Sequence, residues 1–584
     1  MFFQNHIRII NRKAGLINVP KAILKNKTKL KQTKMLRTKL VALIFSAIFM
    51  IGWNAVAQTS NNTSGETAKN LEGYPNIVLI ITDQFRADAS KREGFELNTT
   101  PFLDNLAETG TWFNRAYCAS PACVPSRTSM ITGRFPTATQ VKSNMNVNDA
   151  VFTKDLFQVA NEKGFNTALI GKNHTYLQPE DFDYWKGYFH LGVDKPETKE
   201  QKDFNDYLKT THYYMDKDPA PFPAEMQLPT QIVKTAENWI DNGGKKGNSP
   251  FLLYMSIPEP HNPYQVSEPY YSMFPPESLP EFKAGSEVLA EKGPKWVVQK
   301  KMMKMGYPGF EKNIPRIRSN YYGMMRLIDD QIKGFVDYLK KTGNYDNTII
   351  IFVSDHGDFT GEYGLIKKGV EVAESLTRIP MIWHGPGIVQ NKDPHTAHVS
   401  NIDIMPTICD ILDVELPDGV QGRSLWPLLK GEDYPEEEFS SIMVQQGFGG
   451  LHFTNLEQYD PYTQDGNITK GKTEFDELNT WTQSGTLRML RKDDWKLAYD
   501  MQGHGQLYNL IKDPEEINNL FGKPEFASKQ MELLEDLLAW ELRAQDPLPL
   551  PHPSNKREYG FKKDPHNYYS PYKEQSAAPA NNED

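Results

Sequence analysis

Four short runs of apolar, mostly β-branched residues set the strongest limit on how this chain can fold. They cover residues 76–81, 166–170, 251–257 and 348–353. A continuous apolar run of this length is typical of a parallel strand that is buried on both faces. A helical pattern, clearest over residues 328–339, lies between the runs, so strands and helices alternate. The sequence therefore predicts an α/β sandwich with a mainly parallel central sheet.

Polar, ionisable residues follow each of these runs directly. In open α/β sheets, ligands bind beyond the carboxyl ends of the strands. We therefore expect the four polar segments to converge on one site. They are Thr82-Asp83-Gln84, Gly171-Lys172-Asn173-His174, Pro258-Glu259-Pro260-His261 and Ser354-Asp355-His356-Gly357.

Residues 123–134, with the sequence CVPSRTSMITGR, combine a cysteine, a proline, two arginines and several hydroxyl groups. Proline is tolerated in the first turn of a helix but not in its interior, so Pro125 predicts a helix that begins close to Cys123. The free N–H groups at this helix start, with Arg127 and Arg134 nearby, would form an anion site. The plainer alternative is a buried structural cysteine beside a helix start.

The same segment resembles the signature of the type I sulfatases, in which Cys or Ser is followed by any residue, Pro and Ser-Arg, with Thr-Gly-Arg further on. The resemblance implies an alkaline-phosphatase-like α/β fold with a smaller α+β C-terminal subdomain. It also implies that a maturation enzyme oxidises Cys123 to formylglycine, whose hydrated form attacks sulfur. Arg127 falls within the same signature and is predicted to belong to the catalytic site.

Asp83, Gln84, Asp355 and His356 offer two carboxylates, an amide oxygen and an imidazole at two strand ends. Mostly oxygen ligands suit a hard cation, and Ca²⁺ tolerates irregular geometry better than Mg²⁺ does. The resemblance places one divalent ion at these positions, usually calcium in bacterial sulfatases, with the formylglycine oxygen at Cys123 completing its shell. Taken singly, an Asp-Gln pair after a strand would be a helix cap more often than a ligand.

Gln84 departs from the pattern of many sulfatases, which have a second Asp at this position. The Asp-Gln pair, followed by Arg86-Ala87-Asp88, resembles the branch that contains choline sulfatases and phosphonate monoester hydrolases. This departure leaves the preference for sulfate over phosphate esters open, but not the presence of the metal.

Two lysines and two histidines complete the match: Lys172, His174, His261 and Lys368. The resemblance implies that the lysines and His261 bind the sulfate oxygens, while His174 touches the formylglycine. Cations in a dry pocket would stabilise the negative charge of the transition state. A histidine can protonate the leaving alcohol, and we assign this role to His261 and the deprotonation of the hydrated aldehyde to His174. The spacing favours Lys368 over Lys367 as the second lysine of the site.

The start of the chain predicts export. Residues 1–57 contain eleven Lys or Arg and no Asp or Glu, and they include an apolar run over residues 40–53. Small residues precede an expected cleavage after Ala57, so we interpret this region as a secretory signal, with a retained membrane anchor as the alternative. Met35 begins a complete signal peptide by itself. The expected location is the periplasm, the cell surface or the medium, with no stable membrane span.

Charge and cysteine content exclude several classes of protein. Removal of residues 1–57 leaves 54 basic and 74 acidic side chains, a net charge of −20. This balance argues against binding to nucleic acid or to anionic membranes. Three cysteines cannot form a disulfide framework, and a Cys118–Cys123 bridge is not expected because it would consume the nucleophile.

We predict a linker over residues 58–73, a catalytic domain over 74–430, a C-terminal subdomain over 431–550 and a loosely ordered tail over 551–584. Short antiparallel strands are expected at residues 487–490, 495–499 and 506–510, and a helix at 526–542. A Pro- and Tyr-rich excursion over residues 262–315 either shapes the rim of the pocket or is a plain surface insertion. Candidate sugar contacts, each more typical of structural or surface residues, are His452, Trp481, Arg491 and His504.

Together these features predict a secreted, calcium-dependent sulfatase that acts on a sulfated carbohydrate such as ulvan, fucoidan, carrageenan or a glycosaminoglycan. One alternative is a phosphonate monoester or phosphodiester hydrolase of the same superfamily. Another is an inactive, carbohydrate-binding relative.

Overall fold

The predicted parallel strands lie side by side at the centre of an eight-stranded sheet, within the part of the chain that the structure describes. The protein is represented by a computed structural model that describes residues 71, 73–244, 249–282, 284–369, 371–448 and 485–545. The strand order is β2-β9-β8-β1-β7-β4-β5-β6. The strands are β1 (Asn76–Asp83), β2 (Thr111–Trp112), β4 (Asn166–Gly171), β5 (Tyr184–Phe189), β6 (Gly192–Val193), β7 (Phe251–Pro260), β8 (Thr348–Ser354) and β9 (Met381–His384).

Five of these strands, β8, β1, β7, β4 and β5, run parallel, while β9 and β6 are antiparallel to their inner neighbours. The carboxyl ends of β1, β4, β7 and β8 therefore meet at one edge of the sheet. Gly171 permits the close approach of β4 to β7, because a Cβ atom there would lie 1.8 Å from the carbonyl oxygen of Ser256. The mainly parallel α/β sandwich predicted from the sequence is confirmed.

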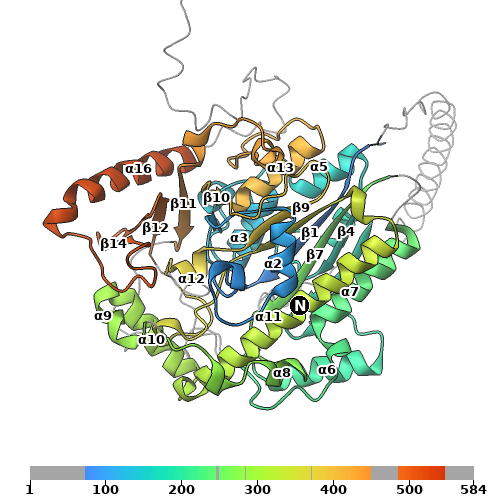
Figure 1. Cartoon of the computed structure of the whole chain (residues 1–584), viewed down its shortest axis with the longest axis horizontal. Helices are drawn as coiled ribbons and strands as arrows, with labels where there is room; N and C mark the ends of the chain where they lie inside the picture. Colours follow the sequence, from blue (N-terminus) through green and yellow to red (C-terminus); the bar gives the residue numbers. More distant parts are fainter. Residues whose placement is uncertain are drawn as a thin grey trace, which may run out of the picture. The chain divides into compact units, whose positions relative to one another are not determined.

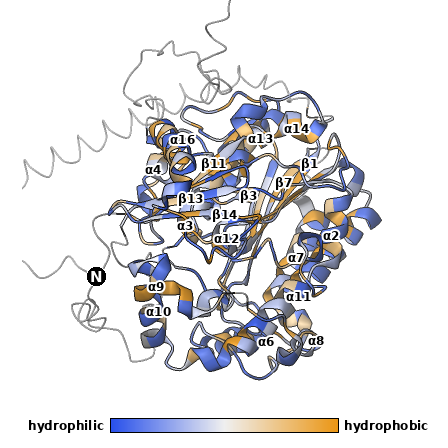
Figure 2. Ribbon diagram, turned by 60° about the vertical axis from the view of Figure 1, so that its left-hand side comes forward, coloured by the Kyte–Doolittle hydropathy of each residue, from blue (hydrophilic) through white to orange (hydrophobic). Residues whose placement is uncertain are grey.

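Alternate residues of β1 point into two separate hydrophobic cores, one on each face of the sheet. Val78 and Ile80 belong to one core, and Ile77, Leu79 and Ile81 belong to the other. Helices α2 (Pro101–Glu108), α7 (Leu228–Trp239) and α11 (Ile314–Lys341) cover the first face, and α3 (Cys123–Thr132), α5 (Leu156–Lys163) and α13 (Ile404–Ile411) cover the second (Figure 1). Figure 2 shows β1 and β7 as largely hydrophobic ribbons between these layers.

The C-terminal part contains the predicted antiparallel sheet, which has four strands in the order β11-β12-β13-β14. Its strands are β11 (Ser441–Gln446), β12 (Leu487–Lys492), β13 (Trp495–Asp500) and β14 (Gly505–Asn509), and α16 (Ala527–Gln545) packs against them. The strand β11 was not predicted. The boundary near residue 430 remains a prediction, and the predictions for the signal region, the tail, His452 and Trp481 lie outside the described residues.

The excursion over residues 262–315 is more regular than its sequence suggested, because it contains α8 (Tyr270–Met273), α9 (Leu289–Lys292) and α10 (Pro294–Gly306). Lys300 of α10 donates a hydrogen bond to the carbonyl of Gly364. The excursion thus contacts the loop that leads to Lys368. The remaining described elements are β3 (Ala116–Tyr117), α4 (Pro136–Thr139), α6 (Lys199–Thr210), α12 (Glu374–Thr377), β10 (Val399–Ser400) and α14 (Trp426–Lys430).

Cys118, Cys123 and Cys409 are all buried and free. Among the described residues, no helix is both long enough and apolar enough to cross a membrane.

Candidate active site

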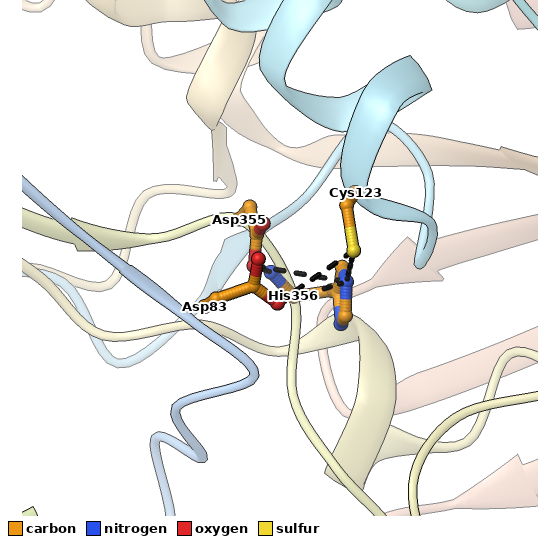
Figure 3. A group of neighbouring side chains, drawn as sticks. All are labelled: Asp83, Cys123, Asp355 and His356. Atoms are coloured by element: carbon orange, nitrogen blue, oxygen red, sulfur yellow. Dashed lines mark hydrogen bonds and ion pairs between the residues drawn. The ribbon is translucent and has the colours of Figure 1, made fainter. Parts of the chain in front are cut away.

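Cys123 is the first residue of α3, and its side chain meets ligands from two strand ends. Ala122 caps the helix in an extended conformation, Pro125 lies in the first turn, and Gly133 ends the helix with a φ of 63°. The Sγ atom of Cys123 lies 3.2 Å from Nε2 of His356 and 3.6 Å from Oδ1 of Asp83. The buried side chains of Asp83, Cys123, Asp355 and His356 face one another, with their ligand atoms all within 4.8 Å of each other (Figure 3).

This cluster has the chemistry of a divalent-cation site. Nδ1 of His356 donates to the carbonyl of Gly357 at 2.9 Å, which leaves the Nε2 lone pair facing the carboxylates. Burial lowers the pKa of His356, so its imidazole is neutral and able to coordinate a metal. Burial alone would raise the pKa of Asp83, but the positive charges of Lys172 and Arg127 hold it well below its usual range. Two carboxylates and a neutral imidazole fit a divalent metal ion.

Arg127 holds the carboxylates of Asp83 and Asp355 in place. Its Nε donates to Oδ2 of Asp355 at 2.7 Å, and its Nη2 donates to Oδ2 of Asp83 at 3.3 Å. Its Nη1 donates to Oγ of Ser256 at 2.8 Å and to the carbonyl of Lys172 at 3.2 Å. The guanidinium is fully buried, so it orients metal ligands and leaves none of its charge exposed to solvent.

Gln84 directly follows Asp83 and links the metal cluster to Lys368. Its backbone has a φ of 65°, in the left-handed region that turns the chain sharply after β1. Its side-chain oxygen accepts a hydrogen bond from Nζ of Lys368 at 2.9 Å. Its Nε2 donates to Oδ2 of Asp358 at 2.5 Å, so Asp358 fixes the orientation of the amide. Lys367 turns away and contacts the hydroxyl of Tyr307. Of the two candidate lysines, Lys368 is therefore the one that lies beside Gln84 and His261.

Lys172 and His261 also reach the site, and they contact a further histidine, His190. Nζ of Lys172 contacts Oδ2 of Asp83 and lies 2.7 Å from Nε2 of His190. The rings of His190 and His261 stack, with centroids 3.7 Å apart and an interplanar angle of 19°. Nε2 of His261 lies 3.5 Å from Nζ of Lys368. Burial, His190 and Lys368 lower the pKa of His261 well below its usual value.

His174 follows β4 with a φ of 49°, so the chain turns here as sharply as it does at Gln84. Burial lowers its pKa well below the usual value, and the charge of Lys172 adds to this effect. Its Nδ1 atom is buried and has no hydrogen-bond partner in the part of the chain that the structure describes. A neutral imidazole with a free nitrogen is suited to accept or donate a proton.

The thiol of Cys123 is poorly suited to be the nucleophile itself. Burial raises its pKa to about 12, and the charge of Asp83 acts in the same direction. The reactive thiolate is therefore scarce at neutral pH. This supports the prediction that the residue works in an oxidised form.

Three residues predicted to bind an anion or a sugar have other contacts in the structure. Arg134 donates to the carbonyl of Gly419 at 2.8 Å and is buried, so the anion site proposed at the helix start does not use it. Arg491 is buried and bonded to the hydroxyl of Tyr117 at 2.7 Å, and His504 pairs with Asp500 on the surface. Both are structural or surface residues.

Sequence reasoning missed His190 and Asp358. His190 follows β5 directly, so the rule that polar residues at strand ends form the site would have found it. The strand itself was not predicted, because its sequence YWKGYF contains Lys and Gly and is not a continuous apolar run. Asp358 lies four residues beyond the end of β8, and only its contact with Gln84 marks it as part of the site.

Comparison with known proteins identifies the class to which this fold and site belong. A family model described as Sulfatase matches residues 75–414, which is more than half of the chain. The chain therefore belongs to the sulfatase family and is a sulfuric ester hydrolase with the alkaline-phosphatase-like fold.

Each of the relatives named here is less than 30% identical in sequence to this chain. The ulvan-active sulfatase of Formosa agariphila is 28% identical over 476 residues, which cover 79% of each chain. An N-acetylglucosamine-6-O-sulfatase of Bacteroides thetaiotaomicron is 24% identical over 543 residues, or 82% of this chain and 88% of the relative. The crystal structure of a phosphonate monoester hydrolase of Agrobacterium radiobacter superposes with a TM-score of 0.65 and 22% identity, over 80% of this chain and 96% of that one. At this identity the superposition shows the shared fold alone.

Proposed function

We propose that the protein removes sulfate from a sulfated carbohydrate, using formylglycine at position 123 and a calcium ion held by Asp83, Gln84, Asp355 and His356. The observation that carries this proposal is the position of Cys123, whose Sγ lies at a helix start and 3.2 Å from a metal-ligand imidazole. An oxygen of the oxidised residue at this position would be both a ligand of the ion and the attacking group.

Residues of the protein would carry out the remaining catalytic roles. Calcium would polarise a sulfate oxygen, and the hydrated formylglycine would supply the oxygen that attacks sulfur. Lys172 contacts Asp83 and Lys368 contacts Gln84, and both lysines would bind the other sulfate oxygens. Their positive charge stabilises the charge that develops in the transition state. His174, with its free nitrogen, would take the proton from the oxidised residue at position 123.

His261 would protonate the leaving alcohol. Its Nδ1 donates to the carbonyl of Asn262 at 2.6 Å, so Nε2 is the atom that faces the site. Its lowered pKa makes it neutral in the free protein. A bound sulfate ester brings negative charge next to Nε2 and raises the pKa again. The proton then becomes available when the substrate is present.

The carbohydrate substrate rests on the named relatives and on the start of the chain. An ulvan-active sulfatase and an N-acetylglucosamine-6-O-sulfatase are among the proteins that this chain resembles along most of its length. Residues 1–57 have the composition of a secretory signal, as an enzyme that acts on polysaccharides outside the cytoplasm requires. The excursion over residues 262–315 and the C-terminal part would contact the sugar. A formylglycine-generating enzyme is the required maturation partner.

A desulfation screen tests this proposal. The protein would be co-expressed with a formylglycine-generating enzyme and incubated with defined oligosaccharides of ulvan, fucoidan, carrageenan and glycosaminoglycans. Released sulfate would be measured by ion chromatography, with Cys123→Ala as the control. Release from at least one class is expected. Hydrolysis of 4-nitrophenyl sulfate without release from any oligosaccharide would contradict the carbohydrate substrate.

A phosphonate monoester hydrolase is the second candidate, favoured by the Asp83-Gln84 pair, which resembles that of this branch of the superfamily. The ratio of kcat/KM for 4-nitrophenyl sulfate and for 4-nitrophenyl phenylphosphonate separates the two activities. An inactive carbohydrate-binding relative is disfavoured, because Cys123, Arg127, Lys172 and Asp355 are all retained and lie in or against one cluster.

A further inference from the structure

The side chain of His190 contacts two residues of the catalytic site that come from different strands. His190 follows β5, Lys172 follows β4 and His261 follows β7. Nε2 of His190 lies 2.7 Å from Nζ of Lys172. Its ring stacks on that of His261, with centroids 3.7 Å apart and an interplanar angle of 19°. The edge of this imidazole thus contacts a proposed sulfate-binding group, and its face contacts the proposed acid.

The contact with Lys172 is a hydrogen bond in which the lysine donates. An ammonium group has three N–H donors and no acceptor, so Nε2 of His190 accepts. Burial and the charge of Lys172 lower the pKa of His190 well below its usual value, so the ring is neutral and its proton is on Nδ1. Oδ2 of Asp83 accepts a second hydrogen bond from the lysine. These are the two acceptors of Lys172 within the described residues, so one N–H remains for a sulfate oxygen.

The hydrogen bond to His190 gives this ammonium group a defined orientation. A lysine side chain is a flexible stem with rotatable donors, so a single partner does not fix where its N–H groups point. With Asp83 and His190 as two acceptors, the direction of the third N–H is set. Without His190, only the carboxylate of Asp83 would hold the ammonium group, and the alignment with a bound sulfate would be lost.

The stacking contact holds the plane of the His261 ring. Nδ1 of His261 donates to the carbonyl of Asn262 at 2.6 Å, and this single bond leaves the ring free to tilt about it. The ring of His190 lies against one face of His261 and opposes this tilt. Nε2 of His261 then keeps its position 3.5 Å from Nζ of Lys368. A general acid must hold its proton within hydrogen-bond reach of the leaving oxygen, so the orientation of this ring decides whether it can act.

We propose that His190 is a positioning residue with two separable functions. Its Nε2 atom orients Lys172 toward the sulfate, and its ring holds His261 in the orientation that protonates the leaving group. The inference rests on the proposed function, since it assumes that Lys172 binds sulfate and that His261 is the acid. It does not require that the substrate be a particular carbohydrate.

Two variants each keep one of these functions. Glutamine carries its side-chain oxygen as many bonds from Cα as Nε2 is in histidine, so His190→Gln keeps an acceptor for Lys172 and loses the aromatic ring. His190→Phe keeps a ring for the stack and loses the acceptor. His384→Phe is the matched control, because half-buried His384 also ends a strand, with Nε2 3.1 Å from the hydroxyl of Tyr345 and the two rings 5.3 Å apart. Since β9 is antiparallel to β8, His384 lies at the opposite edge of the sheet.

Two measurements on the matured, full-length protein with calcium separate the functions. Titration calorimetry with inorganic sulfate reports anion binding and involves no leaving group. The ratio of kcat/KM for phenyl sulfate to that for 4-nitrophenyl sulfate reports the acid, because phenolate is the poorer leaving group and needs the proton more.

His190→Phe should weaken sulfate binding about tenfold, as the loss of one hydrogen bond to a charged group predicts, and should leave the ratio unchanged. His190→Gln should lower the ratio by about tenfold or more, a part of the roughly 10²–10⁴-fold that general acid catalysis provides, and should leave sulfate binding unchanged. His384→Phe should change neither measurement.

The proposal is overturned if both variants of His190 change both measurements by the same factor, or if either variant leaves the measurement assigned to it at the wild-type value. His190→Ala removes both functions and replaces a variant that fails to fold. If His190→Phe is lost, alanine must weaken sulfate binding and glutamine must not. If His190→Gln is lost, alanine must lower the ratio and phenylalanine must not.

His261→Ala distinguishes a failure of this inference from a failure of the proposed function. A lowered ratio in His261→Ala with a wild-type ratio in His190→Gln rejects the role of His190 alone. A wild-type ratio in His261→Ala rejects the acid of the proposed function and the inference together. Neither measurement uses a carbohydrate, so the outcome is independent of the desulfation screen.

Discussion

Replacement of Arg127 by methionine tests the architecture of the site most directly. Methionine has a similar length but no charge and no donors. The variant loses the hydrogen bonds to Asp355 and Asp83, together with those to Ser256 and to the carbonyl of Lys172. Both carboxylates are fully buried and would lose a positive partner. Removing one partner of a buried ion pair costs more than the pair contributes, because the remaining charge is left uncompensated.

We expect Arg127→Met to lower the free energy of unfolding by about 3–5 kcal/mol in the presence of a chelator. Unfolding in urea, followed by intrinsic fluorescence, measures this loss. A divalent ion between the same carboxylates would replace part of the missing charge, so calcium should stabilise the variant more than it stabilises the wild-type protein. The kcat for 4-nitrophenyl sulfate should fall strongly, because the metal ligands are no longer held in position.

Arg134→Met is the matched control, since Arg134 is also buried at the end of α3 and donates to the backbone carbonyls of Gly419 and Ala138. It should lose stability by an amount that calcium does not restore, and it should retain bound metal. Our reasoning would be refuted if Arg127→Met unfolded with the wild-type free energy and kept its kcat, or if calcium affected both variants equally.

Four further predictions concern the chemistry. Cys123 should be converted to formylglycine on co-expression with a maturation enzyme; mass spectrometry that finds only the unmodified residue in fully active protein would exclude this mechanism. Asp83→Ala should abolish activity through loss of calcium and should also lower the free energy of unfolding, because Arg127 and Lys172 both lose a buried carboxylate partner; near-normal kcat with bound calcium would show the metal assignment to be wrong. His261→Ala should reduce kcat/KM for sugar sulfates more than for nitrophenyl sulfate, by up to about 10²–10⁴-fold, because a nitrophenolate leaves without a proton; an equal loss would remove His261 from the acid role. The fall in kcat at high pH should occur at a higher pH than the fall in kcat/KM, since bound substrate raises the pKa of His261, and coincident profiles would contradict this.

The central fold could be predicted because its signals are local. Each buried parallel strand is a continuous apolar run, and the polar residue at its end is adjacent in sequence, so Asp83, Lys172, His261 and Asp355 were found together. The strand β5 was missed because Lys186 and Gly187 interrupt its aromatic residues, so it is not a continuous apolar run, and His190 was missed with it. The rule that polar residues at strand ends converge also applies to His190, but the strand that precedes His190 was not recognised in the sequence.

Other parts of the site depend on contacts between distant segments. Asp358 acquires its role from Gln84, which is 274 positions away in the sequence and donates to it at 2.5 Å. Spacing alone could only favour one of two adjacent lysines. The backbone at Lys367 has a φ of 60°, and this turn sends Lys367 toward Tyr307 and Lys368 toward Gln84. No local pattern encodes this difference.

The charges around the site explain why an acidic protein can favour an anionic substrate. Lys172, Lys368 and Arg127 surround two carboxylates, and a divalent ion would add two more positive charges. The neighbouring histidines cannot share this excess, because burial and the lysines lower their pKa values and keep them neutral. Only an arriving anion balances the charge. Under the proposed function, we therefore expect sulfate binding and the protonation of His261 to be coupled, so that the acid forms when the substrate is bound.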